Sequence, residues 1–292
     1  MNKAVKRLLF ISLGVIAMLV TTGTAFNWYL SSRSYDPNYD YLSVLKSSPA
    51  YDYTEKADVT FSYQSKDDPG LVNLRELYHL GTIAGTGTDL EKSQNMLKWV
   101  QETIRHDGSY PLPSKRDAIS LIEYTQSSGH GLNCRGLAIV LSESLLSVGV
   151  KARFVELLPR DFSSESHVVT LAYLSELDQW MYLDPTYQAY FVDETNHYLD
   201  IAEIRSGLIT GSLLQANSSI NYNGGPVDVD YLHYLAKNFY RFASPQVSAF
   251  GIDSSPDRKM VTLNPMGNDS GRRNPFAKNQ VIHNPDVFWA KP

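Results

Sequence analysis

The sequence predicts an α+β fold in which a helix that begins with the only cysteine packs on an antiparallel sheet. Residues 134–148 have apolar side chains at helical spacing, and Gly149 follows where a C-terminal cap belongs. Three strand candidates come next, at residues 151–158, 166–174 and 179–184. A chain of 292 residues is long enough to bury one sizeable core around these elements.

The region before the cysteine predicts further helices. Thr88 and Glu91 have the spacing of a capping box, so a helix is expected from residue 88 to about 104. Other expected elements are a short strand at 59–63, a helix at 71–80, a break at 81–87 and a short helix at 118–124.

The C-terminal third is less regular. Residues 230–242 predict an aromatic-rich helix, and residues 247–252 and 259–263 predict a hairpin. Residues 264–292 are rich in Asn, Pro, Gly and Arg, which is typical of a loop-rich tail. The globular domain is therefore expected to span residues 58–263.

The N-terminus has a targeting pattern. Three basic residues lie within the first seven positions, an apolar run fills residues 8–20, and small residues follow at 21–25. Residues 1–26 are therefore expected to be a signal peptide or a membrane anchor, and both alternatives stay open. Residues 27–57 predict an irregular spacer, and the domain is expected to be exported, either membrane-anchored or secreted.

Composition limits the function classes. A net charge of −5 gives no basic footprint, so nucleic acid is not expected as a partner. The scattered histidines and the absence of a cysteine pair predict no metal site, and no cofactor motif is present. The lone Cys134 excludes an intramolecular disulfide, so it is either a small buried hydrophobe or a reactive thiol.

The position of Cys134 favours reactivity. At the first turn of a helix, unpaired N–H groups and the helix dipole stabilise a thiolate. The same N–H groups can stabilise the oxyanion formed when the sulfur attacks an acyl carbon. A thiolate nucleophile also needs a base, and His167 is the histidine that begins a predicted strand, after a polar loop.

Strand register supplies a third group, Asp184. A symmetric turn between residues 166–174 and 179–184 pairs Leu174 with Gln179, which places Val169 opposite Asp184. His167 then shares a face with Asp184 and lies diagonal to it, within reach of a carboxylate–imidazole hydrogen bond. A turn one residue longer or shorter would put the carboxylate on the opposite face.

Four other residues are weaker candidates for an oxyanion donor or a cleft wall. Gln126, His130 and Asn133 are polar and lie near the cysteine in sequence, but each is equally plausible as an ordinary loop or cap residue. Trp180 lies four residues before Asp184 and could line a cleft, although a strand tryptophan more often belongs to the core.

Four segments together resemble the bacterial transglutaminase-like domain. They are Asn-Cys-Arg-Gly-Leu-Ala at 133–138, Gly-Val-Lys-Ala-Arg-Phe at 149–154, His-Val-Val at 167–169 and Trp-Met-Tyr-Leu-Asp-Pro-Thr at 180–186. The resemblance covers about residues 88–190, the core of the domain. It implies a papain-like α+β core with Cys134 as nucleophile, His167 as base and Asp184 as the orienting acid. Asn133 departs from the family, which often has an acidic residue before the cysteine.

The expected function is acyl transfer through a Cys134 thioester on a peptide or glutaminyl amide at the cell envelope. The outcome would be hydrolysis, as in a cysteine protease or amidase, or cross-linking to an amine. The first alternative is a non-catalytic surface module that uses the same fold to bind a peptide or wall component. A second is an envelope-assembly factor in which the terminal segments recruit partners.

Overall fold

The computed structural model describes residues 35–161, 165–267 and 279–292. The expected targeting segment at residues 1–26 lies outside these ranges. Within the ranges, no helix is both long enough and apolar enough to cross a membrane.

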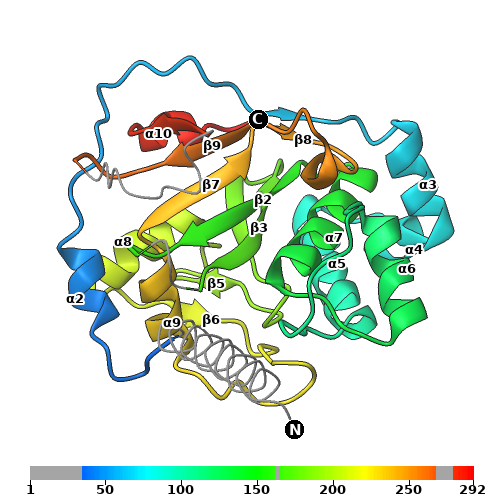
Figure 1. The fold of residues 1–292 in the computed structure, drawn as a ribbon, viewed down its shortest axis with the longest axis horizontal. Helices are drawn as coiled ribbons and strands as arrows, with labels where there is room; N and C mark the ends of the chain where they lie inside the picture. The colour runs from blue at the N-terminus through cyan, green and yellow to red at the C-terminus, as the bar shows by residue number, and fades with distance from the viewer. Residues whose placement is uncertain (1–34, 162–164, 268–278) are drawn as a thin grey trace, which may run out of the picture.

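A six-stranded sheet forms the centre of the domain, in the order β10-β9-β7-β2-β3-β4 (Figure 1). All neighbouring strands are antiparallel except β10 and β9, which are parallel. The strands are β2 (Ala152–Leu158), β3 (His167–Leu174), β4 (Gln179–Leu183), β7 (Arg241–Pro245), β9 (Met260–Leu263) and β10 (Gln280–Ile282). The expected register is confirmed, because Leu174 pairs with Gln179 and the ladder continues to Thr170 opposite Leu183.

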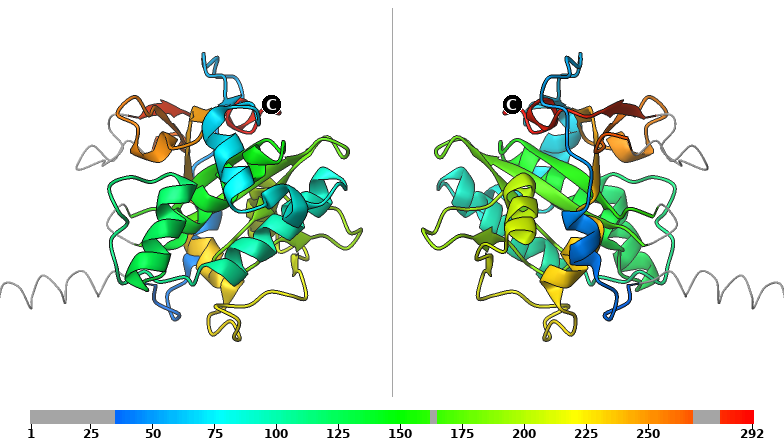
Figure 2. Two further views of the ribbon diagram at one scale, coloured as in Figure 1. Left: turned by 90° about the vertical axis from the view of Figure 1, so that its right-hand side faces the viewer. Right: turned by 90° about the vertical axis from the view of Figure 1, so that its left-hand side faces the viewer.

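Helices cover both faces of this sheet, which gives three layers (Figures 1 and 2). One outer layer contains α3 (Pro69–Leu77), α4 (Leu80–Ala84), α5 (Asp89–Thr103), α6 (Ala118–Ser128) and α7 (Cys134–Ser147). The other contains α2 (Tyr41–Lys46), α8 (Ile201–Thr210) and α9 (Tyr231–Asn238). The expected α+β architecture is therefore correct, with helices on both sides of the sheet.

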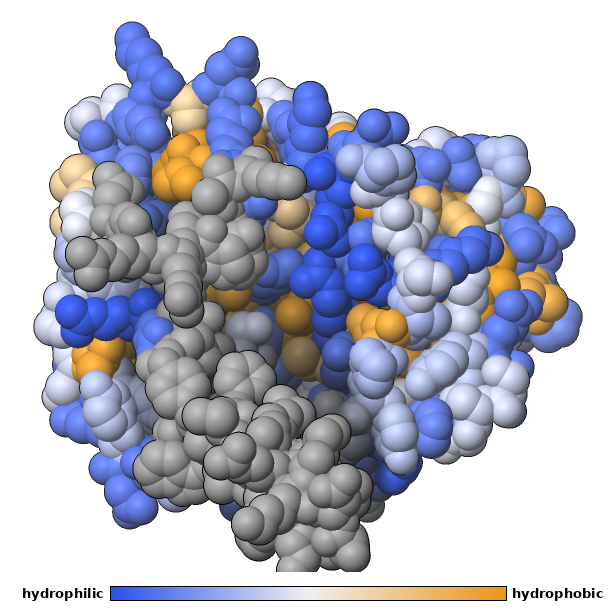
Figure 3. Space-filling model, in the orientation of Figure 1, coloured by the Kyte–Doolittle hydropathy of each residue, from blue (hydrophilic) through white to orange (hydrophobic). Residues whose placement is uncertain are grey.

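Alternating side chains on the strands build two cores. On β3, Val168 and Ala172 face the core that contains α5, α6 and α7, whereas Val169 and Leu171 face the core that contains α8 and α9. Helix α7 is buried along almost its whole length because it packs directly on β2 and β3. On the outer face drawn in Figure 3, hydrophobic residues form small separate patches among hydrophilic ones.

The capping box at Thr88 is confirmed. Its hydroxyl accepts from the Glu91 N–H at 3.2 Å, and the Glu91 carboxylate accepts from the Thr88 N–H at 2.9 Å. These two bonds satisfy N–H groups that would otherwise be unpaired at the start of α5. The helix expected at 118–124 is longer, since α6 continues to Ser128 and ends at Gly129 in a left-handed conformation.

The aromatic helix expected at 230–242 is wrong in its last part. Helix α9 ends at Asn238, and Arg241–Pro245 forms β7 between β2 and β9. Two flanking ladders of backbone hydrogen bonds outweigh the helical spacing that residues 240–242 continue.

The expected hairpin between 247–252 and 259–263 is also wrong. Met260–Leu263 pairs with β7, whereas Val247–Ser248 (β8) pairs in parallel with Ser62–Tyr63 (β1). Residues Ile252–Ser254 form a 3₁₀ turn between these two pairings. The remaining small sheet joins β5 (Phe191–Val192) to β6 (Gln215–Ala216).

The segments expected to be irregular contain ordered elements. The spacer includes α2, whose Leu45 is buried, and the break at 81–87 includes most of α4. In the tail, β10 extends the central sheet and α10 (Pro285–Phe288) packs against it. The loop-like composition did not reveal these helices and this strand, because the elements that they pack against or pair with are distant in sequence.

Arg153 explains why the tail is held in place. Its fully buried guanidinium donates to the Phe288 carbonyl at 2.6 Å and lies within 4.1–5.7 Å of the ring centroids of four aromatic residues. These residues are Phe61, Trp180, Phe288 and Trp289. Cation–π contacts of this kind stabilise a desolvated cation, so the tail closes an aromatic box around Arg153.

We predict that Phe288→Ala destabilises the domain by about 3–5 kcal/mol, the usual cost of removing a buried phenylalanine ring. Urea unfolding followed by circular dichroism measures the change. Tyr53→Ala, which removes an aromatic ring that is 63% exposed, is the matched control, and its expected effect is within about 0.5 kcal/mol. Equal effects of the two substitutions would show that the tail does not contribute to the core.

Candidate active site

Cys134 is the first residue of α7 and is half-buried at its N-terminal end. The preceding Asn133 caps the helix, with its side-chain oxygen accepting from the Gly136 N–H at 3.1 Å. The N–H of Cys134 belongs to the first turn, where no intrahelical acceptor exists. The sulfur therefore lies at the positive end of a helix dipole, as the sequence predicted.

His167 and Asp184 form a buried pair beside this thiol. The His167 Nε2 lies 2.6 Å from the Asp184 Oδ2, and the two side chains are 2% and 0% exposed. Asp184 also accepts from the Tyr231 hydroxyl at 2.6 Å, from the Tyr182 hydroxyl at 3.3 Å and from the Thr186 N–H at 2.9 Å. Since Nε2 is bound to the carboxylate, Nδ1 is the ring nitrogen left for the thiol.

These contacts favour a thiolate–imidazolium pair. Burial raises the pKa of Cys134, but hydrogen bonds with His106 and His167 and the nearby imidazole charge lower it to about 6. Burial lowers the pKa of His167, but the charge and hydrogen bond of Asp184, with a contribution from Cys134, raise it to about 10. Between these two values the sulfur carries a negative charge and the imidazole a positive one.

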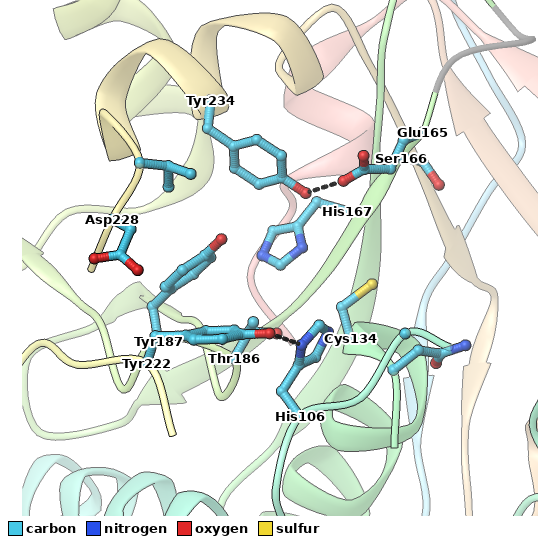
Figure 4. Close-up of a pocket in the computed structure, with 13 residues that line it drawn as sticks. His106, Cys134, Glu165, Ser166, His167, Thr186, Tyr187, Tyr222, Asp228 and Tyr234 are labelled. Atoms are coloured by element: carbon cyan, nitrogen blue, oxygen red, sulfur yellow. Dashed lines mark hydrogen bonds between the residues drawn. The ribbon is translucent and has the colours of Figure 1, made fainter. Parts of the chain in front are cut away.

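The thiol opens into a pocket of about 600 Å³ (Figure 4). Cys134 and His106 reach it from the side of the helical layer, and His167 reaches it from β3. Tyrosines and the exposed carboxylates of Glu165 and Asp228 complete the wall. The residues that line the pocket are His106, Gly108, Asn133, Cys134, Glu165, Ser166, His167, Thr186, Tyr187, Tyr222, Asp228, Val229 and Tyr234.

The weaker sequence candidates have mixed outcomes. Asn133 lines the pocket, but its side-chain oxygen is engaged in the cap. Gln126 is exposed on α6 and His130 stacks on Tyr110 at 3.7 Å, and neither lines the pocket. Trp180 is a core residue whose indole N–H donates to the Trp289 carbonyl at 3.1 Å. Gln126 and His130 therefore lie outside the pocket wall, and Trp180 has the core position that its place on a strand favoured.

Sequence reasoning did not single out His106 and Tyr231. His106 lies beside the thiol in the same pocket as His167, and Tyr231 binds the buried carboxylate. A histidine shortly after the end of a helix and directly before Asp107-Gly108 was visible in the sequence. Its approach to Cys134 depends on a backbone pairing with Leu132, which no local pattern reveals.

Across residues 35–161, 165–267 and 279–292, no three or more His, Cys, Asp and Glu side chains form a group that could hold a metal ion. The acid–base groups of the pocket are the side chains described above.

Comparisons with known proteins find a family match for part of the chain. Residues 78–185 match the transglutaminase-like superfamily. A proposed protease from Parabacteroides distasonis ATCC 8503 is 15% identical with a TM-score of 0.27, over 44% of this chain and 30% of that one. The transglutaminase of red sea bream is 14% identical with a TM-score of 0.27, over 50% and 27%. This chain thus covers less than a third of either structure. The comparison with curated proteins found no match.

We predict that alkylation of Cys134 by iodoacetamide rises with a midpoint near pH 6, because the thiol has a pKa of about 6. The chain has one cysteine, so the intact mass reports this residue alone. In His167→Ala, burial still raises the thiol pKa while one stabilising partner is lost, so the midpoint should move above that of the wild type. His130→Ala is the matched control. If all three proteins had the same midpoint, the thiolate–imidazolium pair of Cys134 and His167 would be contradicted.

Proposed function

We propose that the transglutaminase-like domain at residues 78–185 catalyses thiol-dependent acyl transfer on a peptide or glutaminyl amide through a thioester on Cys134. One observation carries the proposal: a thiol of lowered pKa faces a histidine that a buried carboxylate holds, at the wall of an open pocket. Cys134, His167 and Asp184 are thus arranged as a nucleophile, its base and the acid that orients the base.

The first half of the reaction follows from the charges. The Cys134 thiolate attacks the carbonyl carbon of the amide, so a C–S bond forms and the carbonyl oxygen becomes an oxyanion. When the oxyanion collapses, the C–N bond breaks and the imidazolium of His167 donates its proton to the departing nitrogen. Ammonia or an amine leaves, and the acyl group remains on sulfur as a thioester.

The second half regenerates the thiolate. His167, now neutral, takes a proton from water or from an amine as that group attacks the thioester carbon. The C–S bond breaks, and the product is a carboxylic acid or a new amide. We place hydrolysis first, because the pocket wall includes the exposed carboxylates of Glu165 and Asp228, where water has access.

Asp184 acts on His167 rather than on the substrate. Its carboxylate fixes the imidazole orientation through Nε2 and stabilises the imidazolium. The hydroxyl of Tyr231 and the N–H of Thr186 hold the carboxylate in turn, so it keeps its charge although it is buried. Burial raises the pKa of Asp184, but the charge and hydrogen bond of His167 lower it below its ordinary value.

The proposed place of action is the cell envelope. This part of the proposal rests on the sequence of residues 1–26 alone, where basic residues precede an apolar run and small residues. The pocket, which is open to solvent and lined by several tyrosines, supports a peptide or protein substrate but does not bear on the place of action.

We predict that p-nitrophenyl acetate acetylates Cys134 and releases p-nitrophenolate in a burst. The rate constant should exceed that of an ordinary surface thiol by at least about 10²-fold, the size of effect that general acid–base assistance and oxyanion stabilisation give. Intact mass measures the adduct, and p-nitrophenolate absorbance measures its rate.

The matched control is the double variant Cys134→Ala/Ser212→Cys, which moves the single thiol to an exposed position. Equal rates in the two proteins would contradict an activated nucleophile and favour a non-catalytic binding module. Decay of the acetyl adduct in water, with and without added methylamine, then compares hydrolysis with transfer to an amine.

A further inference from the structure

We infer that His106 is a second catalytic residue, whose Nε2–H donates to the oxyanion together with the backbone N–H of Cys134. This inference rests on the proposed function, since it concerns the same acyl-transfer step. His106 lies beside the thiol, as His167 does, and both imidazoles line the pocket (Figure 4).

A backbone pairing fixes the position of His106. Residues 105–107 run alongside Leu132, with the Asp107 N–H donating to the Leu132 carbonyl at 2.7 Å and the Leu132 N–H donating to the Arg105 carbonyl at 3.0 Å. Leu132 is two residues before Cys134, so this pairing ties the His106 backbone to the segment that leads into α7.

Gly131 allows this close approach. A Cβ atom at this position would lie 2.2 Å from the Arg105 carbonyl oxygen, a distance that real contacts essentially never show. Any side chain at residue 131 would therefore push the 105–107 segment away from the helix start. The glycine thus has a specific role in bringing the second imidazole to the thiol.

A loop that is distant in sequence fixes the ring. The Tyr222 hydroxyl lies 3.0 Å from the His106 Nδ1. The Asn223 side chain accepts from the His106 N–H at 2.8 Å and donates to the His106 carbonyl at 3.1 Å. With the phenol donating to Nδ1, the ring proton is on Nε2, the nitrogen left to face the sulfur and the bound acyl group.

The partners of the two histidines assign different roles to them. His167 is bound to a buried carboxylate, which stabilises the imidazolium that a base must become. His106 is bound to a phenol, which orients the ring without adding a negative charge. A ring held in this way suits hydrogen-bond donation to a developing oxyanion. Its hydrogen bond to the thiol also contributes to the lowered pKa of Cys134.

The step balances without any further component. As the thiolate forms the C–S bond, the carbonyl π electrons move to oxygen, and the two donors stabilise that charge without transferring a proton. When the oxyanion collapses, the electrons return and the C–N or C–O bond to the leaving group breaks. His106 is therefore unchanged at the end of the step.

The test compares two reactions of the same sulfur. Acetylation by p-nitrophenyl acetate forms an oxyanion, whereas alkylation by iodoacetamide does not. In His106→Ala, the thiolate-specific acetylation rate constant, taken from the pH profile, should fall about 10²–10³-fold, the usual effect of losing one oxyanion donor. The thiolate-specific alkylation rate constant should change by less than about tenfold. His106→Gln, which keeps an N–H donor, should recover part of the acetylation rate.

The outcomes separate the two proposals. If wild-type Cys134 is acetylated no faster than the surface thiol of Cys134→Ala/Ser212→Cys, the proposed function fails, and the inference fails with it. If the wild type is fast and His106→Ala is equally fast, or loses both reactions in equal proportion, the function stands and the role of His106 is overturned.

Tyr222→Phe provides a second variant in case His106→Ala does not fold. Loss of the Tyr222 hydroxyl leaves the imidazole in place but no longer selects the tautomer with the proton on Nε2. Acetylation should therefore slow about tenfold, as expected for the loss of one orienting hydrogen bond, while alkylation is unchanged. Tyr198→Phe, whose ring packs on Tyr190 outside the pocket lining, is the matched control. Equal acetylation rates for both variants would overturn the positioning role of Tyr222.

Discussion

The buried contact between His167 and Asp184 is the interaction on which the candidate site depends. An isolated carboxylate in an apolar interior would be strongly destabilised. Asp184 avoids this cost because it accepts hydrogen bonds from an imidazole, two tyrosine hydroxyls and a backbone N–H. Those donors come from β3, β4, α9 and the turn after β4. The carboxylate therefore joins four parts of the fold at one point and fixes the imidazole that faces the thiol.

The thiol itself comes from the opposite layer, so the start of α7 must be held against the sheet. Arg135, the residue after the cysteine, pairs with Glu156 of β2 at 2.5 Å and with Asp253 at 2.6 Å. One turn further along, the Thr170 hydroxyl of β3 donates to the Ala138 carbonyl at 3.1 Å. Charge pairs at the first turn and a hydrogen bond at the second fix both the position and the direction of the helix. These contacts of Arg135 and Thr170 therefore help to hold the sulfur close to the imidazole.

Local rules were sufficient for the central part of the site. His167 begins β3 and Asp184 directly follows β4, and a short turn joins these two adjacent strands. The alternation of side chains along the strands and the register of this one pair therefore determine whether the two groups meet. The start of α7 at Cys134 likewise follows from helical spacing. Features set by distant partners were not accessible in this way. His106 is held near the thiol by a backbone pairing with Leu132 and by the hydroxyl of Tyr222. Residues Arg241–Pro245 form β7 because β2 and β9 flank it, although the spacing of residues 240–242 continues a helical pattern.

Two fully buried aspartates show why partner chemistry, rather than burial, distinguishes the site. Asp253 is held by Arg116, Arg135 and Arg258. Burial raises the pKa of Asp253, but these arginines keep it below its ordinary value. Guanidinium groups do not give up a proton in proteins, so this cluster can only hold elements together. Asp184 has an imidazole as its charged partner, and an imidazole can release and regain a proton while it stays in place. The same buried carboxylate chemistry therefore stabilises the fold at one position and supports proton transfer at the other.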